Sequence, residues 1–234
     1  MDIRQMQQWL NQKIQLNQLT IPLLLEDGVG GPKTRDAIYQ VFRCKKPSKV
    51  TESQLLDYAR KLGDSSVQRL KAIAKIETGS GAWAQDGLPR ILYERHYFYR
   101  VVKKTLYLPS KQLQFLAKQD GGGYGFSWEK LAHAACIHPI GAFSSVSMST
   151  FQVMGSYYQA LGYATPLDML YEVSRTEAAH YQLLMGYILN IAKIKSAFLK
   201  ISKNPETNRD FAKRYNGANY QQNQYHVKLA NAMR

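Results

Sequence analysis

One stretch, residues 66–81 (SVQRLKAIAKIETGSG), combines a helical apolar stripe with a carboxylate at its end. Glu77 falls seven residues after Leu70 and four after Ile73, which places it on the apolar face of a helix that Gly79 and Gly81 then end. Desolvation on that face and the negative end of the helix dipole both raise the pKa of a carboxyl group. The pattern therefore predicts a general acid, although it also fits a glutamate that frays at an exposed helix end.

Three further segments follow in a recognisable order. They are GLPRILYERHYFYR (87–100), MSTFQVMG (148–155) and FAKRYNG (211–217), and they come after IETGSGAW (76–83). Together they resemble the N-acetylmuramidase domain of modular phage endolysins, a lysozyme-like family that cleaves peptidoglycan. The resemblance covers residues 51–234 and implies an α-rich (α+β) catalytic domain with at most a small sheet.

The same resemblance implies the site residues. Glu77 would protonate the leaving oxygen, and a second carboxylate would activate water or stabilise the transition state. Glu94, within the ERH triplet, is the preferred second carboxylate, and Asp86 in the preceding loop is its rival. Met148-Ser149 stands where the superfamily usually has Trp-Gly. The implied substrate-binding residues, whose C-terminal members equally suit plain packing, are Asp86, His96, Ser149, Gln152, Tyr215, Asn216 and Tyr220.

The N-terminal residues carry a second resemblance. Residues 2–16 have the apolar spacing of a helix, and EDGVGGPKTRDAIYQVF (26–42) reads as a glycine turn followed by a helix that Pro32 opens. The turn resembles the D-G-x-F-G-P-x-T signature of small peptidoglycan-binding domains, with Val29-Gly30 in place of x-F. We expect a small three-helix wall-binding domain at 1–48, the alternative being a plain helical hairpin. Its wall-binding residues would be Asp27, Gly28, Gly31 and Thr34.

Capping patterns delimit the other elements. CKKPSKV (44–50) is a basic, Pro-containing linker, so we place the domain boundary there, and the catalytic domain begins with a Thr51–Gln54 capping box. A Thr165-Pro166 cap opens another helix. Ser174-x-x-Glu177 is expected to cap a long buried helix that runs to Ile191.

Composition narrows the partners. With 31 Lys+Arg against 17 Asp+Glu the chain carries +14, which favours polyanions such as the acidic polymers of a bacterial envelope. The basic residues form no solid block, so we expect no nucleic-acid partner. The longest apolar run, 183–194, is interrupted by polar residues and is too short for stable membrane insertion. We expect a monomer that binds peptidoglycan.

Cysteine usage and the N-terminus indicate the compartment. Two cysteines give no disulfide framework, and the polar first residues give no secretory signal. We therefore expect the host bacterial cytoplasm, with release to the wall through another protein. His133, Cys136 and His138 match no common zinc spacing, so no metal and no cofactor are expected.

The function expected is hydrolysis of the β-1,4 bond between N-acetylmuramic acid and N-acetylglucosamine. Two alternatives stay open. A lytic transglycosylase would need one acid and no hydrolytic water, and a non-catalytic basic protein would bind walls through its charge alone.

Overall fold

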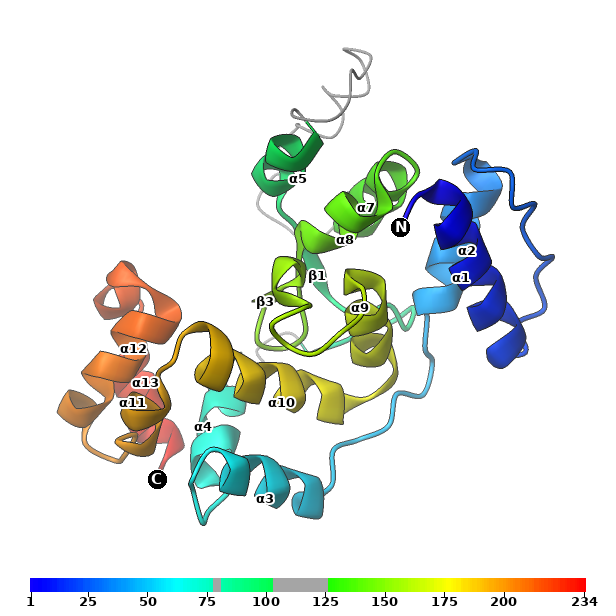
Figure 1. Ribbon diagram of the computed structural model, residues 1–234. Coiled ribbons are helices and arrows are strands. Elements are labelled where there is room, and N and C mark those ends of the chain that lie inside the picture. Colours follow the sequence, from blue (N-terminus) through cyan, green and yellow to red (C-terminus); the bar gives the residue numbers. More distant parts are fainter. Residues whose placement is uncertain (78–80, 103–125) are drawn as a thin grey trace. The chain divides into compact units, whose positions relative to one another are not determined.

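The computed structural model describes residues 1–77, 81–102 and 126–234 (Figure 1). Contacts within the chain divide it into two compact units. The first is Met1–Lys46 with Trp83–Ser174, and the second is Pro47–Ala82 with Arg175–Arg234. Both units are mainly helical, and the first also contains a small sheet, as the sequence predicts.

The N-terminal part of the first unit is a helical hairpin of α1 (Ile3–Leu16) and α2 (Pro32–Phe42), which lie side by side in Figure 1. Asp2 and Gln5 form a capping box at the start of α1. The structure has two helices here and not the expected three. The segment between them carries Pro22 and a Gly28 with φ of +78°, so it forms turns and no regular helix.

Phe42, the last residue of α2, is fully buried among aromatic rings of the first unit. Its ring centroid lies 5.4 Å from that of Phe143, 5.6 Å from that of Trp128 and 5.7 Å from that of Trp9. Residues from both stretches of the unit therefore share one aromatic core. Aromatic pairs of this kind stabilise the fold by more than the apolar area they bury.

The rest of the first unit is built around a three-stranded antiparallel sheet in the order β1-β2-β3. Its strands are β1 (Ile91–Tyr93), β2 (Val146–Met148) and β3 (Val153–Met154). Leu92 pairs with Ser147, which in turn pairs with Met154. The helices are α5 (Arg95–Val102), α7 (Ser127–Ala135), α8 (Pro139–Ser144), the short 3₁₀ helix η2 (Gly155–Tyr157) and α9 (Pro166–Arg175).

The second unit contains helices from both of its stretches. They are α3 (Glu52–Lys61), α4 (Gln68–Glu77), α10 (Glu177–Gly186), α11 (Lys195–Leu199), α12 (Arg209–Asn216) and α13 (Tyr225–Ala232). Shorter turns are the π-helical η3 (Tyr187–Ile191) and the 3₁₀ helices η4 (Pro205–Asn208) and η5 (Ala218–Gln221). Thr51 and Gln54 form the predicted capping box of α3.

The expected cap of the long helix is wrong by two residues. Ser174 lies inside α9, where its hydroxyl donates to the carbonyl of Tyr171 at 2.6 Å. Thr176 caps α10 instead, because its hydroxyl accepts the amide of Ala179 at 3.0 Å. The helix then continues to Ile191 as the π-helical turn η3.

The core of the second unit lies between α4 and the C-terminal helices. α4 packs against α13, and the large side chains Leu70, Phe198 and Phe211 are fully buried. This packing presents the C-terminal end of α4 to α13.

Candidate active site

Glu77 is the last residue of α4, and its side chain is half-buried. Ile73 and Leu70, one and two turns earlier on the same face, are fully buried, as their spacing predicts. Burial is the largest influence on Glu77 and raises the pKa of its carboxyl above the ordinary value. A carboxyl group in this setting keeps its proton to higher pH and is suited to protonate a leaving group.

Helix α13 supplies the nearest polar groups to this carboxyl. The Tyr225 hydroxyl donates to Glu77 Oε1 at 2.6 Å, from a side chain that is 3% exposed. Lys228 stands one turn further along the same helix. Both residues favour the ionised form of Glu77 and lower its pKa, although burial outweighs them.

Tyr215 lies beside this pair. Its ring stacks on Phe211 at a centroid distance of 5.1 Å and lies 6.0 Å from the ring of Tyr225. Part of the residue is exposed, but its hydroxyl oxygen is buried and has no hydrogen-bond partner among the described residues. Burial, together with the charge of Glu77, raises the pKa of Tyr215 well above the ordinary value. Tyr215 therefore belongs to the surroundings of Glu77.

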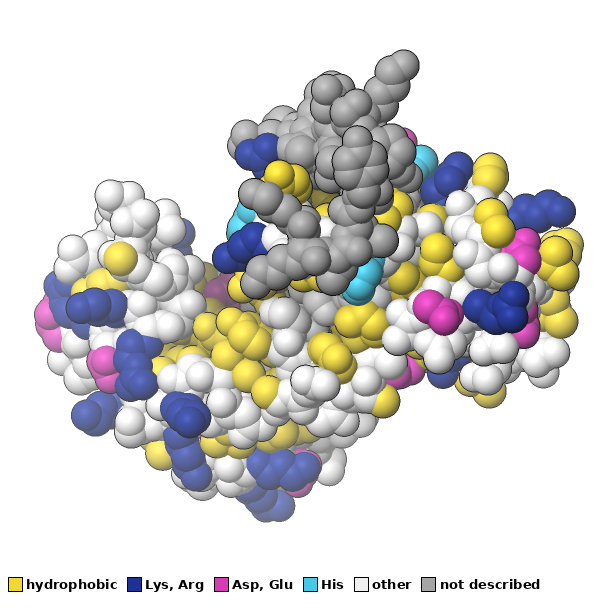
Figure 2. All heavy atoms as spheres, turned by 45° about the horizontal axis from the view of Figure 1, so that its top comes forward, with side chains coloured by type: hydrophobic (Ala, Val, Ile, Leu, Met, Phe, Trp, Pro, Cys, Tyr) yellow, Lys and Arg dark blue, Asp and Glu magenta, His cyan; other side chains and the backbone are white. Residues whose placement is uncertain are grey.

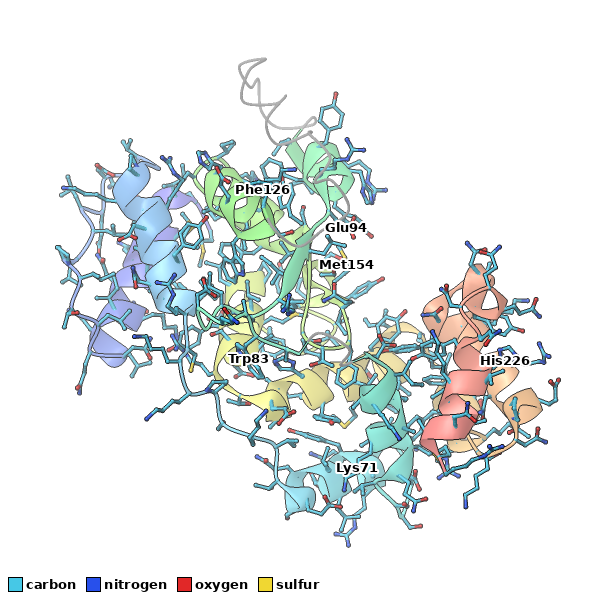
Figure 3. All side chains as sticks on the ribbon, turned by 180° about the vertical axis from the view of Figure 1, so that it is seen from behind. Lys71, Trp83, Glu94, Phe126, Met154 and His226 are labelled. Atoms are coloured by element: carbon cyan, nitrogen blue, oxygen red, sulfur yellow. The ribbon has the colours of Figure 1, made fainter. Side chains whose placement is uncertain are left out.

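The other two substrate-binding residues expected near the C-terminus, Asn216 and Tyr220, differ in their exposure to solvent. Asn216 is exposed at the end of α12, where Gly217 turns the chain with φ of +94°. Tyr220 is 7% exposed, and its ring packs edge-on against His226 of α13, which Figure 3 labels. The Tyr220 hydroxyl accepts from Gln221 Nε2 at 3.2 Å, so its polar atom is already engaged.

Glu94 belongs to the first unit and stands between β1 and α5, where Figure 3 labels it. Its backbone amide donates to the carbonyl of Ser145 at 2.7 Å, and its own carbonyl accepts from Tyr97 at 2.9 Å. The side chain keeps 28% of its surface exposed, and its Oε2 lies 3.5 Å from His96 Nδ1. The backbone of Glu94 is thus held by hydrogen bonds, and its carboxylate remains reachable from solvent.

The β2–β3 hairpin contains the next two expected residues. Ser149 and Gln152 have positive φ angles, +70° and +51°, which non-glycine residues rarely adopt. Gln152 is held by two bonds, from Ser147 Oγ to its Oε1 at 2.8 Å and from its Nε2 to the carbonyl of Ser149 at 3.1 Å. Ser149 is 2% exposed, and its hydroxyl accepts the amide of Phe151 at 3.1 Å. Ser149 therefore shapes the turn, whereas Gln152 is partly exposed.

Asp86 lies in the loop before β1, whereas Glu94 follows that strand. One oxygen of Asp86 accepts the amide of Leu88 at 3.1 Å, and the other is 3.6 Å from Arg43 Nη2. Asp86 also lines a pocket of about 740 Å³ together with Tyr39, Arg90 and other side chains of the first unit.

The N-terminal turn is closed by its own polar groups. Asp27 Oδ1 accepts from Gln7 Nε2 at 3.0 Å and from the amide of Val29 at 2.8 Å, and these bonds lower the pKa of Asp27. The amide of Gly28 donates back to Gln7 Oε1 at 2.9 Å. Thr34 is 2% exposed in α2, and Gly31 is the N-cap residue of that helix. The motif thus holds the turn against α1.

Gly30 explains why this chain departs from the usual turn signature. A Cβ built on Gly30 would lie 2.5 Å from Cys136 Cβ and 2.6 Å from the Cys136 carbonyl oxygen. No side chain fits there, because the turn approaches the end of α7 too closely. Burial raises the pKa of the Cys136 thiol to about 11, so this cysteine stays protonated and unreactive.

Lys and Arg side chains are scattered over the face seen in Figure 2 and are not gathered in one block. Among residues 1–77, 81–102 and 126–234 no three His, Cys, Asp or Glu side chains are grouped to hold a metal ion. None of the described helices is long and apolar enough to cross a membrane.

The comparisons with known proteins decide the family. Residues 66–234 match the sequence model of a family described as Muramidase, N-acetylmuramidase. This chain belongs to the N-acetylmuramidase family. The muramidase is therefore a lysozyme-type glycoside hydrolase, and peptidoglycan is its substrate.

The muramidase is also similar in fold to a solved structure, the crystal structure of the Burkholderia AP3 phage endolysin. The sequences are 24% identical, and the match covers 99% of this chain and 93% of that chain with a TM-score of 0.67. The comparison with curated proteins found no match. Fold likeness therefore extends over the N-terminal hairpin as well as the muramidase region.

Sequence reasoning missed the partner of Glu77. Tyr225 and Lys228, beyond the FAKRYNG motif, are not among the residues that the sequence implies for the site. The two residues stand three apart at the start of α13, a spacing that places them on the same face of a helix. The sequence shows this spacing, but it does not show that this face of α13 packs against α4.

Proposed function

We propose that Glu77 is the general acid of the muramidase. The main support for this role is the half-buried carboxyl of Glu77 at the end of α4, where burial raises its pKa. In the reaction the proton moves from Glu77 to the glycosidic oxygen as the bond to the anomeric carbon breaks. The rate gain expected from a positioned acid is about 10²- to 10⁴-fold.

Glu94 is the proposed second carboxylate. Its support is a backbone held by hydrogen bonds, a partly exposed carboxylate, and a histidine whose Nδ1 lies 3.5 Å from the Glu94 Oε2. An inverting route needs about 6.5–9.5 Å between the two carboxyl groups, and a retaining route about 5–5.5 Å. Asp86, tied to Arg43 and Leu88, is the weaker candidate and is proposed as a substrate-binding residue.

The proposed sugar-binding residues are His96, Ser149, Gln152, Tyr215, Asn216 and Tyr220. His96, Gln152 and Asn216 have exposed or partly exposed polar groups that suit hydroxyl and acetamido partners. Ser149 and Tyr220 would act indirectly, by holding the hairpin and the end of α12 in shape.

The N-terminal residues 1–48 are proposed to hold the enzyme on the wall, with residues 51–234 as the catalytic domain. The contact would be made around the turn of Asp27, Gly28, Gly31 and Thr34, beside which Leu25 and Val29 are 77% and 66% exposed. Exposed apolar side chains on an ordered turn suit an amphipathic glycan better than they suit water.

The cellular role proposed is that of a phage endolysin. The muramidase would be made in the host bacterial cytoplasm as a monomer and would reach the wall through release by another protein. Its +14 charge would assist contact with anionic envelope polymers, without nucleic acid or membrane insertion as a partner.

Mass spectrometry of digested peptidoglycan tests the reaction. Hydrolysis gives fragments with a reducing N-acetylmuramic acid end, whereas a lytic transglycosylase gives the anhydro-sugar. We expect the wild type to release fragments with reducing ends and Glu77→Gln to release none. Anhydro products would show that one acid suffices, and no cleavage at all would favour a protein that only binds walls.

A further inference from the structure

The hydrogen bond between the Tyr225 hydroxyl and Glu77 Oε1 joins residues 148 positions apart. At 2.6 Å it has the length of a strong O–H···O bond to a carboxyl oxygen. Tyr225 is 3% exposed, so water cannot readily replace its hydroxyl. Helix packing between α4 and α13 fixes both partners.

The direction of this bond follows from the surroundings of Tyr225. Burial and the neighbouring Tyr215 and Glu77 raise the pKa of Tyr225 well above the ordinary value, so the phenol keeps its proton. Tyr225 is therefore the donor and Glu77 Oε1 the acceptor. A protonated carboxyl carries its hydrogen on one oxygen only, so the catalytic proton is left on Oε2.

We propose that Tyr225 is a positioning residue for Glu77, which fixes the transferable proton on Oε2 and stabilises the carboxylate that remains after transfer. This inference rests on the proposed role of Glu77 as general acid. In the step, the Oε2–H bond breaks, the proton joins the glycosidic oxygen, and Glu77 becomes negative. Tyr225 keeps its own proton throughout.

The bond would assist the reaction because it strengthens as charge develops. Before transfer it joins two neutral groups, and afterwards it joins a phenol to a carboxylate, which is about twice as strong. Only interactions that are stronger in the transition state accelerate the chemical step. Tyr225 thus offsets part of the desolvation that would otherwise oppose ionisation of Glu77.

The backbone before Tyr225 is consistent with a fixed position. Gln224, which precedes α13, has a left-handed conformation with φ of 50° and ψ of 35°. Non-glycine residues adopt this conformation at a cost, and it persists where the surrounding structure determines it. Gln224 is the residue directly before Tyr225, so the chain enters α13 through this conformation.

The groups that act on Glu77 come from two helices. Tyr225 and Lys228 are on α13, and both lower the pKa of Glu77. Tyr215 on α12 interacts with the same carboxyl through its buried hydroxyl. Removing the Tyr225 hydroxyl takes away one of the two groups that lower the pKa of Glu77. The effect of burial then dominates more strongly, and this pKa should rise further.

The test is Tyr225→Phe in the full chain, assayed on a soluble glycan fragment. We expect kcat to fall about 100-fold, the lower end of the loss seen when one donor to a developing oxyanion is removed, while KM stays nearly constant. The alkaline limb of the kcat/KM profile should move to higher pH. The matched control is Tyr58→Phe, on α3, where kcat and the limb should not change.

A direct readout is the NMR titration of the Glu77 carboxyl carbon in protein labelled with ¹³C-glutamate. Its midpoint should be higher in Tyr225→Phe than in the wild type, whereas the control Tyr58→Phe should leave the midpoint unchanged. An unchanged or lower midpoint in Tyr225→Phe would overturn the positioning role. Wild-type activity of Glu77→Gln would instead overturn the proposed function on which the inference rests.

Discussion

The indole N–H of Trp9 donates to Asp168 Oδ1 at 2.9 Å, across 159 positions of the sequence. Nearby, the Tyr171 hydroxyl donates to Asn17 Oδ1 at 2.8 Å. Together with the buried ring of Phe42, these contacts tie the N-terminal hairpin to the rest of the first unit. The hairpin therefore contributes to stability as well as to the proposed wall binding.

Deleting residues 1–48 should leave a chain that folds, as the sequence-based boundary predicts, but with a clearly lower melting temperature. The deletion uncovers Phe143 and Trp128, and Phe42→Ala alone should cost about 3–5 kcal/mol, the usual range for a buried phenylalanine. Thermal unfolding of the three chains measures this. An unchanged melting temperature would mean that the aromatic contacts contribute nothing, and a deletion that fails to fold would place the domain boundary elsewhere.

The sequence predicted elements whose signals are local. The 3.6-residue spacing of Leu70, Ile73 and Glu77 gave helix α4 and the buried face of its carboxylate, and the Thr51–Gln54 pattern gave the cap of α3. The cap of α10 was misplaced because Ser174 and Thr176 both offer a hydroxyl near Glu177. The structure shows that α9 extends to Arg175, so Ser174 lies within that helix and Thr176 is the residue between the two helices.

Contacts between distant segments could not be predicted in this way. Nothing local to Tyr225 indicates that its hydroxyl meets Glu77, since that depends on how α13 docks on α4. Likewise, only the structure shows that Ser149, a proposed sugar-binding residue, has a left-handed backbone and that its hydroxyl accepts the amide of Phe151. A residue's chemistry was readable, whereas the direction of its side chain was not.

The stability of the muramidase should depend on pH through Glu77. Its folded-state pKa is raised above the ordinary 4.5, so the folded state holds the proton more tightly than the unfolded state does. That contribution is fully present below the unfolded pKa and is lost as the pH rises through the folded pKa. Glu77→Gln, which keeps an acceptor for Tyr225, removes this dependence.

Melting temperatures of the wild type and Glu77→Gln between about pH 4 and pH 8 test this sign. The variant should gain relative to the wild type as the pH rises. A constant difference across the range would show that the pKa of Glu77 is the same in both states.

Glu94→Gln should be strongly impaired, whereas Asp86→Asn should be milder. Each change removes one charge and keeps the shape, but only Glu94 is proposed to act on the water or the transition state. Asp86 is engaged by Leu88 and Arg43, and its amide analogue keeps an acceptor for the Leu88 amide. Steady-state rates on one soluble glycan fragment compare the two variants. The reverse order would make Asp86 the second carboxylate, and full activity of both would favour a one-acid mechanism.

Asp27→Asn should weaken retention on purified cell walls several-fold with little change in cleavage of soluble fragments. The carboxylate of Asp27 holds the turn by accepting from the Gln7 side chain and from the Val29 amide. Asp36→Asn, an equal change of charge on α2, is the control and should bind walls normally. Equal retention of both variants would remove the turn from wall binding.

The rate of Glu77→Gln tests the central claim most directly. The amide keeps the shape of the side chain and an acceptor for Tyr225, but it cannot donate the catalytic proton. The initial rate of peptidoglycan solubilisation should fall about 100-fold or more, with the variant still folded by circular dichroism and thermal unfolding. Wall lysis by the folded variant at close to the wild-type rate would contradict the assignment of Glu77 as the general acid.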